Sequence, residues 1–317
     1  MSMAGKRDCY CGYAKAEVYW TKKGKTTMEE MHRKTGLVRI VADSTCDLSQ
    51  ELRAAYGISI LPLNIVLDLE SFCDGEQIGP DEIYAWAEAN KKTPKTAAVA
   101  FDRGEKLRRS FQERGEDVVF IGISEAMSTT CNVMRMVKQE LDYDRMFVVD
   151  SQNLSTGIGL QVLAAADLAK EGKTAEEIVA ALEKLREKVS ASFVVERLDY
   201  LAMGGRCSSV TALLGTKLKL KPGIEVHGGT MSAGKKYRGK QDKVILNYVQ
   251  DRKAELLAAD PKRVFITHSG VEEEVIRQVR EFLESLNRFQ QILITRAGGV
   301  ISSHCGPGTL GVLYVRG

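Results

Sequence analysis

Short apolar runs alternate with amphipathic segments along the first half of the chain. Runs bounded by polar residues predict buried strands, and apolar residues at helical spacing predict helices between them. Strands crossed by helices are typical of a mostly parallel sheet. The predicted strands are residues 37–42, 58–66, 118–123 and 146–150. The predicted helices are residues 80–90, 132–141, 160–170 and 175–188. Pro62 interrupts the second run, which favours an edge strand or a bend there.

The pattern changes after residue 190. The pair Gly228-Gly229 predicts a hairpin. Further strands are predicted at residues 192–195, 264–269, 291–296 and 310–315, and helices at 199–203, 244–257 and 272–286. A hairpin combined with helix-linked strands predicts a sheet that is not purely parallel. We therefore expect an N-terminal α/β domain over residues 37–190, with a mostly parallel sheet flanked by helices, and a C-terminal mixed α/β domain over residues 191–317.

The composition fits a soluble globular protein. The chain has 317 residues, of which 44% are hydrophobic and 27% are charged, and this length favours two domains. Its apolar runs are much shorter than the roughly 20 residues of a membrane helix, so no transmembrane segment is expected. Seven scattered cysteines without an export signal predict free thiols and a cytoplasmic location. No metal site is expected, because the spacing of Cys9 and Cys11 is too short for a zinc knuckle.

Charge is unevenly distributed. The formal net charge of +3 is too small to indicate a nucleic acid partner. Residues 1–36 carry a net +4 and are interpreted as an extension, whereas the remaining 281 residues carry −1. Within that body, residues 197–240 carry +7 and only two aromatic residues. Such a surface would attract an acidic protein face, a phosphorylated ligand or anionic lipid headgroups; the alternative is a solvated rim.

Hydroxyl side chains are concentrated in the loops that follow three predicted strands, at residues 43–45, 124–130 and 151–156. Ligands bind at the carboxyl ends of strands in open parallel sheets, and hydroxyls can hold a carboxylate or a phosphate. The same residues are also common helix caps. His304 lies in a glycine-rich stretch where the backbone can approach a ligand. Cys305 would point away from it on an extended segment, which disfavours a Cys–His dyad.

A series of short motifs runs through the body in a fixed order. They are Asp43–Leu48 (DSTCDL), Leu61–Leu63 (LPL), Asp74–Gly75, Asp150–Ser151 with Ser155–Gly159, Leu198–Arg206 (LDYLAMGGR), Lys221–Pro222, Arg238–Gly239 and His304–Gly308 (HCGPG). In order and spacing they resemble the DegV family, whose best-understood members are the fatty-acid-binding subunits of bacterial fatty acid kinase. The resemblance extends from about Val38 to Val315 and leaves residues 1–36 outside.

The resemblance implies a two-domain α/β protein that buries one long-chain fatty acid in a tunnel and uses no other cofactor. Such a protein is not itself an enzyme. It presents the acyl carboxylate to a separate ATP-dependent kinase, which makes an acyl phosphate for phospholipid synthesis. The residues that match the family's carboxylate contacts are Thr96, Ser128 and His304, with Thr129 beside Ser128. Those that resemble its kinase-facing arginines are Arg206 and Arg238.

Three departures from the family pattern affect the expected headgroup site. The segment Ala97–Ala100 lacks a hydroxyl that the family has, Thr129 replaces a glycine, and Cys305 replaces a threonine. Because a β-branched residue disfavours positive φ, the loop at Thr129 is expected to be repositioned. Two alternatives stay open: a stand-alone phosphotransferase or hydrolase that uses His304 and Ser128, and a regulatory protein with a vestigial pocket. The candidate tunnel-lining segments are residues 97–101, 158–166 and 210–214.

Overall fold

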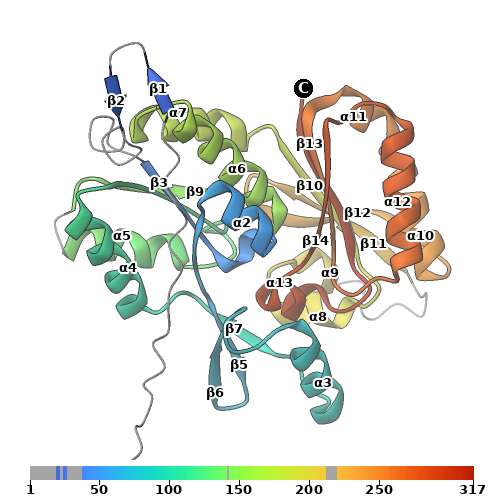
Figure 1. Ribbon diagram of the computed structural model, residues 1–317. Coiled ribbons are helices and arrows are strands. Elements are labelled where there is room, and N and C mark those ends of the chain that lie inside the picture. The colour runs from blue at the N-terminus through green and yellow to red at the C-terminus, as the bar shows by residue number, and fades with distance from the viewer. Residues whose placement is uncertain (1–18, 22–23, 27–37, 141–142, 212–219) are drawn as a thin grey trace, which may run out of the picture. The chain divides into compact units, whose positions relative to one another are not determined.

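The computed structural model describes residues 19–21, 24–26, 38–140, 143–211 and 220–317 (Figure 1). The chain divides into two compact units, Met1–Leu37 and Val38–Gly317. In the first unit, β1 (Tyr19–Thr21) and β2 (Gly24–Thr26) form an antiparallel ribbon. Cys9 and Cys11 lie outside the described residues. All other described elements belong to the second unit.

A four-stranded parallel sheet forms the first half of this second unit, as predicted. Its strand order is β4-β3-β8-β9. The first strand in the sequence, β3, is therefore an inner strand, with β4 on one side of it and β8 and β9 on the other. The strands are β3 (Val38–Asp43), β4 (Ser59–Leu61), β8 (Asp117–Gly122) and β9 (Met146–Asp150). The 3-10 turn η1 (Ser44–Cys46) and α2 (Gln50–Tyr56) connect β3 to β4. Helices α4 (Phe101–Arg114) and α5 (Thr130–Glu140) pack on one face, and α6 (Thr156–Lys170) and α7 (Ala175–Arg186) on the other.

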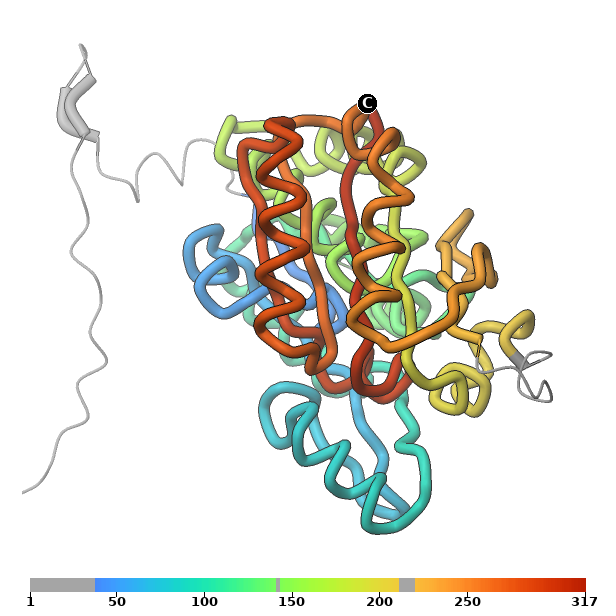
Figure 2. The backbone as a smooth tube through the Cα atoms, turned by 90° about the vertical axis from the view of Figure 1, so that its right-hand side faces the viewer, coloured from blue at the N-terminus to red at the C-terminus, as the bar shows by residue number. Residues whose placement is uncertain are grey.

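A six-stranded sheet forms the second half and is mixed, which confirms the prediction. Its order is β12-β11-β10-β15-β13-β14, and β13–β14 is its parallel pair. The strands are β10 (Val189–Val194), β11 (Lys221–His227), β12 (Thr230–Tyr237), β13 (Ala259–His268), β14 (Gln291–Arg296) and β15 (Leu310–Arg316). Helices α10 (Gln241–Asp251), α11 (Lys253–Ala258) and α12 (Glu273–Ser285) cover its outer face (Figure 2).

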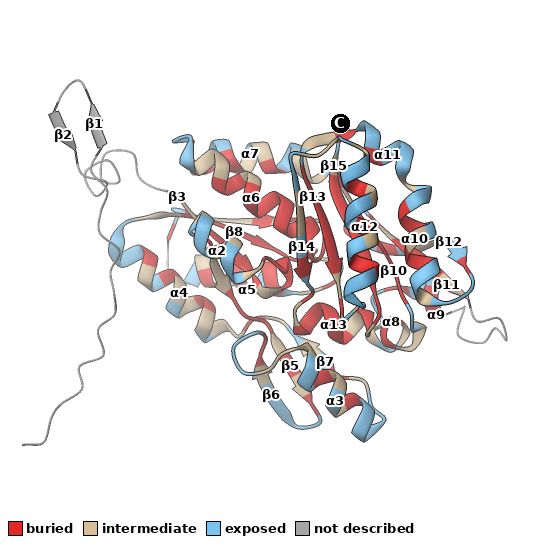
Figure 3. Ribbon diagram, turned by 45° about the vertical axis from the view of Figure 1, so that its right-hand side comes forward, coloured by how far each residue is buried: buried red, intermediate tan, exposed pale blue. Residues whose placement is uncertain are grey.

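Helix α6 packs between the two sheets. It contacts β3 and β8 on one side and β10, β13 and β15 on the other. Residues 156–163 are all buried, which is seen as a red helix in Figure 3. This double burial explains why its apolar residues occupy more than one helical face. Strand β10 begins at Val189, and the division of the body at residue 190 stays a prediction.

A three-stranded antiparallel sheet with three short helices extends from the end of the parallel sheet (Figures 1 and 2). The predicted strand over residues 58–66 is in fact two strands in different sheets, because Pro62 separates them. Helix α13 forms where we expected an extended segment around His304, so that expectation is wrong. The elements are β5 (Asn64–Leu67), β6 (Glu70–Cys73), β7 (Lys95–Ala97), α3 (Pro80–Asn90), α8 (Leu198–Gly204) and α13 (Gly299–Cys305). The short helix α9 (Ser208–Thr211) follows α8.

Candidate functional site

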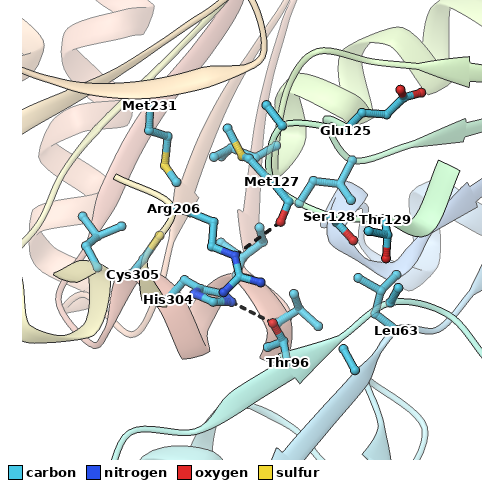
Figure 4. Close-up of a pocket in the computed structure, with 18 residues that line it drawn as sticks. Leu63, Thr96, Glu125, Met127, Ser128, Thr129, Arg206, Met231, His304 and Cys305 are labelled. Carbon is cyan, nitrogen blue, oxygen red and sulfur yellow. Dashed lines mark hydrogen bonds between the residues drawn. The ribbon is translucent and has the colours of Figure 1, made fainter. Parts of the chain in front are cut away.

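A cavity of about 560 Å³ lies among β7, α8, α13 and the loop after β8 (Figure 4). Five of the six residues singled out from the sequence line it: Thr96, Ser128, Thr129, Arg206 and His304. Most of the remaining wall is apolar, and it is made by Leu63, Ala97, Ala98, Ile123, Ala126, Met127, Leu154, Leu201, Met231, Val300, Ile301 and Cys305. The cavity therefore combines a small polar cluster with a large hydrocarbon-like surface, which suits a long amphipathic ligand.

The imidazole of His304 and the hydroxyl of Thr96 form the centre of the polar cluster. His304 Nε2 and Thr96 Oγ1 are 2.8 Å apart. Burial, together with the nearby Arg206 charge, lowers the pKa of His304 to about 4. The ring is therefore neutral at physiological pH. A neutral ring that carries its proton on Nε2 donates to Thr96 and leaves the threonine hydroxyl free to donate to a ligand.

Gly204 fixes the other side of the His304 ring. Nδ1 is buried and has no hydrogen-bond partner among the described residues. A Cβ atom at Gly204 would collide with this same nitrogen, so the backbone of α8 packs directly against the ring. Gly205 then ends α8 with φ +69°. The two glycines that precede Arg206 thus have different roles. Gly204 lets the backbone approach the His304 ring closely, and Gly205 ends the helix.

Two buried carboxylates hold the beginning of α13, the helix that carries His304. Asp47 Oδ1 accepts the Gly298 N–H at 2.8 Å, and Asp74 Oδ1 accepts the Gly299 N–H at 2.8 Å. Asp47 Oδ2 also accepts the hydroxyl of Ser155 at 2.6 Å. The bonds to Gly298 and Gly299 each satisfy a backbone N–H that has no partner within the helix itself. The DSTCDL and Asp74-Gly75 motifs therefore position α13 rather than contact the cavity, a role that the sequence analysis missed.

Burial raises the pKa of all three carboxyl groups in this region. It raises the pKa of Asp43 to about 6, that of Asp47 to about 8, and that of Asp74 above its ordinary value. Hydrogen bonds oppose the effect of burial in each case. Asp43 Oδ2 accepts the Ile123 N–H at 2.8 Å and so connects the end of β3 to the loop after β8. Since none of the three lines the cavity, their shifts belong to the scaffold.

The loop after β8 brings the hydroxyls of Ser128 and Thr129 to the cavity. Ser128 Oγ lies 2.9 Å from Thr130 Oγ1, and Ser128 N–H donates to the Ser124 carbonyl at 3.0 Å. Thr129 is exposed, and its φ is not positive. The loop therefore accommodates a β-branched residue without left-handed backbone. Of the three hydroxyl-rich loops expected to meet a ligand, this is the one whose hydroxyl side chains line the cavity; the loop over residues 151–156 contributes the apolar Leu154.

The hydroxyls of the other two loops serve the scaffold. Ser155 bonds Asp47, and Thr156 Oγ1 lies 2.6 Å from Thr267 Oγ1 in the core. Ser44 Oγ accepts the Leu63 N–H at 3.2 Å. Among the expected tunnel-lining segments, Ala97 and Ala98 line the cavity, whereas residues 158–166 are core residues of α6. Residues 212–214 lie outside the described residues.

The two arginines singled out from the sequence separate in space. Arg206 lines the cavity, with Nε donating to the Met127 carbonyl at 3.3 Å and Nη1 to the Gly204 carbonyl at 2.6 Å. Arg238 is exposed between β12 and α10 and does not line the cavity. Arg206 therefore borders the cavity, and Arg238 does not.

The described residues show little sign of nucleophile or metal chemistry at the cavity. Burial raises the pKa of the Cys305 thiol to about 12, so it is protonated at neutral pH. The five cysteines of the described region are buried free thiols. Among the same residues, no group of three or more metal-ligating side chains occurs. None of the described helices is both long enough and apolar enough to cross a membrane.

Comparison with known proteins identifies relatives along almost the whole second unit. A family model described as "Uncharacterised protein, DegV family" matches residues 37–317. A DegV domain-containing protein from Deinococcus radiodurans is 33% identical over 276 residues, which is 87% of this chain and 97% of the relative.

Solved structures show the same fold. One reports fatty acid binding of a DegV family protein from Thermus thermophilus; it has a TM-score of 0.79 and 31% identity, and the match covers 88% of this chain and 99% of that one. Another, from Thermotoga maritima, is described as revealing a fatty acid binding function. It has a TM-score of 0.76 and 27% identity over the same shares of the two chains. The mixed α/β architecture is therefore that of these structures.

Proposed function

The chain belongs to the DegV family, and from that premise we propose that it binds a long-chain fatty acid in the 560 Å³ cavity and presents the carboxylate to a separate ATP-dependent kinase. One observation carries the first part of the proposal. Thr96, Ser128, Thr129 and His304, which come from distant parts of the sequence, converge on one cavity whose wall is otherwise mostly apolar.

The headgroup chemistry suits a carboxylate. A carboxylate removed from water needs several hydrogen bonds, and the Thr96 and Ser128 hydroxyls can donate them. His304, being neutral, orients Thr96 without adding a charge. The acyl chain would contribute about 0.8 kcal/mol for each buried methylene. The apolar wall thus supplies affinity, and the polar cluster supplies orientation.

Lipid extraction tests the binding step directly. The purified full-length protein is denatured and extracted with organic solvent, and the extract is analysed by mass spectrometry. We expect a co-purifying long-chain fatty acid. Ser128→Ala and His304→Ala should reduce the recovered lipid, whereas Ser110→Ala, at a half-buried position of α4 that does not line the cavity, should not. A folded wild-type protein that yields no lipid and binds no added fatty acid would contradict the proposal.

Presentation to a kinase is supported by the charge of the surface near the end of β12. In the part of the chain that the structure describes, Lys236, Arg238 and Lys240 are exposed and form no ion pair, whereas their neighbour Lys235 is paired with Asp251 at 2.6 Å. Unpaired cations at a rim speed association with an acidic partner. Because such a kinase uses ATP, the proposal includes a cytoplasmic location for the protein.

Charge reversal of Arg238 tests this second step. In a reconstituted system with an acyl-phosphate-forming kinase, Arg238→Glu should strongly reduce acyl phosphate production and leave fatty acid binding unchanged. Arg280→Glu, on the outer helix α12, is the matched control and should retain production. Normal production by Arg238→Glu would remove this surface from the proposal without affecting lipid binding.

The arrangement does not favour a stand-alone hydrolase. A nucleophile and its base must be within hydrogen-bond reach, with the base oriented by a third group. Here Ser128 bonds Thr130, and His304 bonds Thr96. Among the described residues nothing bonds His304 Nδ1, the position where an orienting acid would act.

A further inference from the structure

We infer that the guanidinium of Arg206, at the rim of the cavity, is the counter-charge of the ligand headgroup. This rests on the proposed function, because it names the group that compensates the charge of the bound carboxylate. It also distinguishes Arg206 from Arg238: both side chains are exposed, but Arg206 lines the cavity and Arg238 does not.

The charge balance of the cavity wall is the first argument. Its lining residues include three side chains with acidic or basic groups other than a thiol: Glu125, Arg206 and His304. Glu125 forms an ion pair with Arg135 of α5, so its charge is compensated from outside. His304 is neutral at physiological pH. Arg206 is therefore the lining residue whose positive charge is available to a ligand.

The geometry of Arg206 is the second argument. Its Nε and Nη1 donate to the backbone carbonyls of Met127 and Gly204 at 3.3 and 2.6 Å, which hold the side chain between the loop after β8 and the end of α8. Nη2 donates to none of the described residues. Figure 4 shows the guanidinium between Met127 and the His304–Thr96 pair. The Arg206 guanidinium is thus held by two neutral carbonyl groups, which leave its positive charge available to a ligand.

Elementary electrostatics gives the third argument. Hydroxyls and a neutral imidazole can satisfy the hydrogen bonds of a carboxylate, but they carry no charge to offset its removal from water. Hydrogen bonds from arginine to a carboxylate are charge-assisted and stronger than neutral ones. An arginine already held at the rim loses little further side-chain entropy when it binds. A fatty acid should accordingly bind better than an uncharged ligand of the same length.

The test compares palmitic acid with hexadecanol, which have the same chain length but differ in headgroup charge. Affinities of both ligands are measured for the delipidated full-length protein and for Arg206→Gln. We expect Arg206→Gln to weaken palmitate binding by roughly tenfold or more and to leave hexadecanol binding unchanged. Arg206→Lys should retain part of the preference, because it keeps the charge but not the planar fork. Arg238→Gln is the matched control and should change neither affinity.

The outcomes distinguish this inference from the proposed function. An unchanged ratio of acid to alcohol affinity in Arg206→Gln would overturn the inference while fatty acid binding stands. An equal loss of both ligands would also overturn it, because Arg206 would then shape the cavity rather than compensate charge. Failure of the wild-type protein to bind either ligand would overturn the proposed function itself. Circular dichroism on each variant confirms that it is folded.

Discussion

At the scale of single residues, the His304 ring has Thr96 on one side and the Gly204 backbone on the other. Both neighbours favour a neutral imidazole, because neither carries a negative charge that would stabilise a proton. Burial alone disfavours the charged form, and the Arg206 charge adds to that effect. The ring therefore acts as a fixed hydrogen-bonding group rather than as a proton carrier near neutral pH.

This neutrality predicts a pH-dependent stability. The pKa of His304 is about 4 in the folded protein, whereas an unperturbed histidine has a pKa of 6.5. Between these two pH values the unfolded chain binds a proton at His304 and the folded protein does not. The wild type should lose up to about 3 kcal/mol of unfolding free energy through this residue as the pH falls from 7 to 4. Urea unfolding of the wild type and His304→Gln at several pH values checks it. The stability gap between them should shrink toward low pH; a constant gap would contradict the assignment.

The two glycines before Arg206 offer a second prediction at this scale. Gly204→Ala should displace the His304 ring, because the new Cβ would collide with Nδ1; we expect a loss of about 1–3 kcal/mol in stability and weaker fatty acid binding. Gly205→Ala is the matched control. Its Cβ meets nothing within 4 Å and suffers only from φ +69°, at a cost of about 1–2 kcal/mol. Calorimetry and a lipid titration compare the variants. Equal lipid affinities for the two would mean that the ring position does not matter.

At the scale of elements, α13 is a seven-residue helix that depends on side chains from elsewhere in the chain. An isolated helix of this length is not stable in water. Asp47 and Asp74 bond its first N–H groups, and α3, α8, β5 and β7 pack around it. The orientation of His304 at its last turn therefore depends on Asp47 and Asp74, which lie more than 200 positions away in the sequence, and on the packing of α8.

Replacement of Asp47 tests this coupling. Asp47→Ala should destabilise the protein by about 2 kcal/mol or more and weaken lipid binding through His304, while Asp47→Asn should keep an acceptor for Gly298 and retain most of both. Asp81→Ala removes an exposed ion pair with Arg296 and should cost less than about 1 kcal/mol. Urea unfolding and lipid titration measure both effects. Full lipid affinity in a folded Asp47→Ala variant would show that α13 is held in place by packing alone.

The contribution of the Asp47 carboxyl group to stability also depends on pH. The pKa of Asp47 rises from 3.8 to about 8 on folding because the group is buried, so its contribution to stability is complete below pH 3.8 and is lost as the pH rises through about 8. Asp47→Asn does not titrate. Relative to the wild type, this variant should therefore become more stable as the pH increases from 5 to 8. A parallel pH dependence of the two proteins would mean that Asp47 is ionised in the folded state.

The elements that the sequence predicts well are those with a strong local pattern. Strand β9 and helix α3 were predicted at their observed bounds, because an apolar run and a proline-led helix start are local signals. Helix α13 was missed, because Gly298-Gly299 and Gly306-Pro307-Gly308 flank a short serine-containing segment that is typical of a loop. Its helical state comes from Asp47 and Asp74, which no local pattern reveals.

In the candidate site, too, some features could be predicted from the sequence and others depend on the folded structure. The resemblance pointed to Thr96, Ser128 and His304, which share the cavity. It did not reveal that Arg206 lines the cavity and Arg238 does not, since both belong to one basic segment of the sequence. Nor did it reveal which hydroxyl loop faces the ligand, because the turn and capping roles of serine look the same in sequence. Both distinctions become visible only in the folded structure, where the loop after β8 and Arg206 line the cavity.

At the scale of the whole molecule, the cavity draws its walls from residues between Leu63 and Cys305, all within the unit Val38–Gly317. The DegV match covers residues 37–317, and residues 1–36 carry a net charge of +4 that the rest of the chain does not share. The described lining of the cavity therefore belongs entirely to the second unit.

Deletion of residues 1–36 tests this independence. We expect the shortened chain to unfold cooperatively with the urea midpoint of the full chain, because the hydrophobic core clusters of the described residues run from Val38 onward. Its affinity for palmitate should change less than about twofold, a free energy difference well below one hydrogen bond. Its net charge changes from +3 to −1, so any attraction to an acidic partner that depends on overall charge should weaken, while attraction through Arg238 should persist. A large loss of lipid affinity on deletion would instead mean that residues 1–36 contribute to the site.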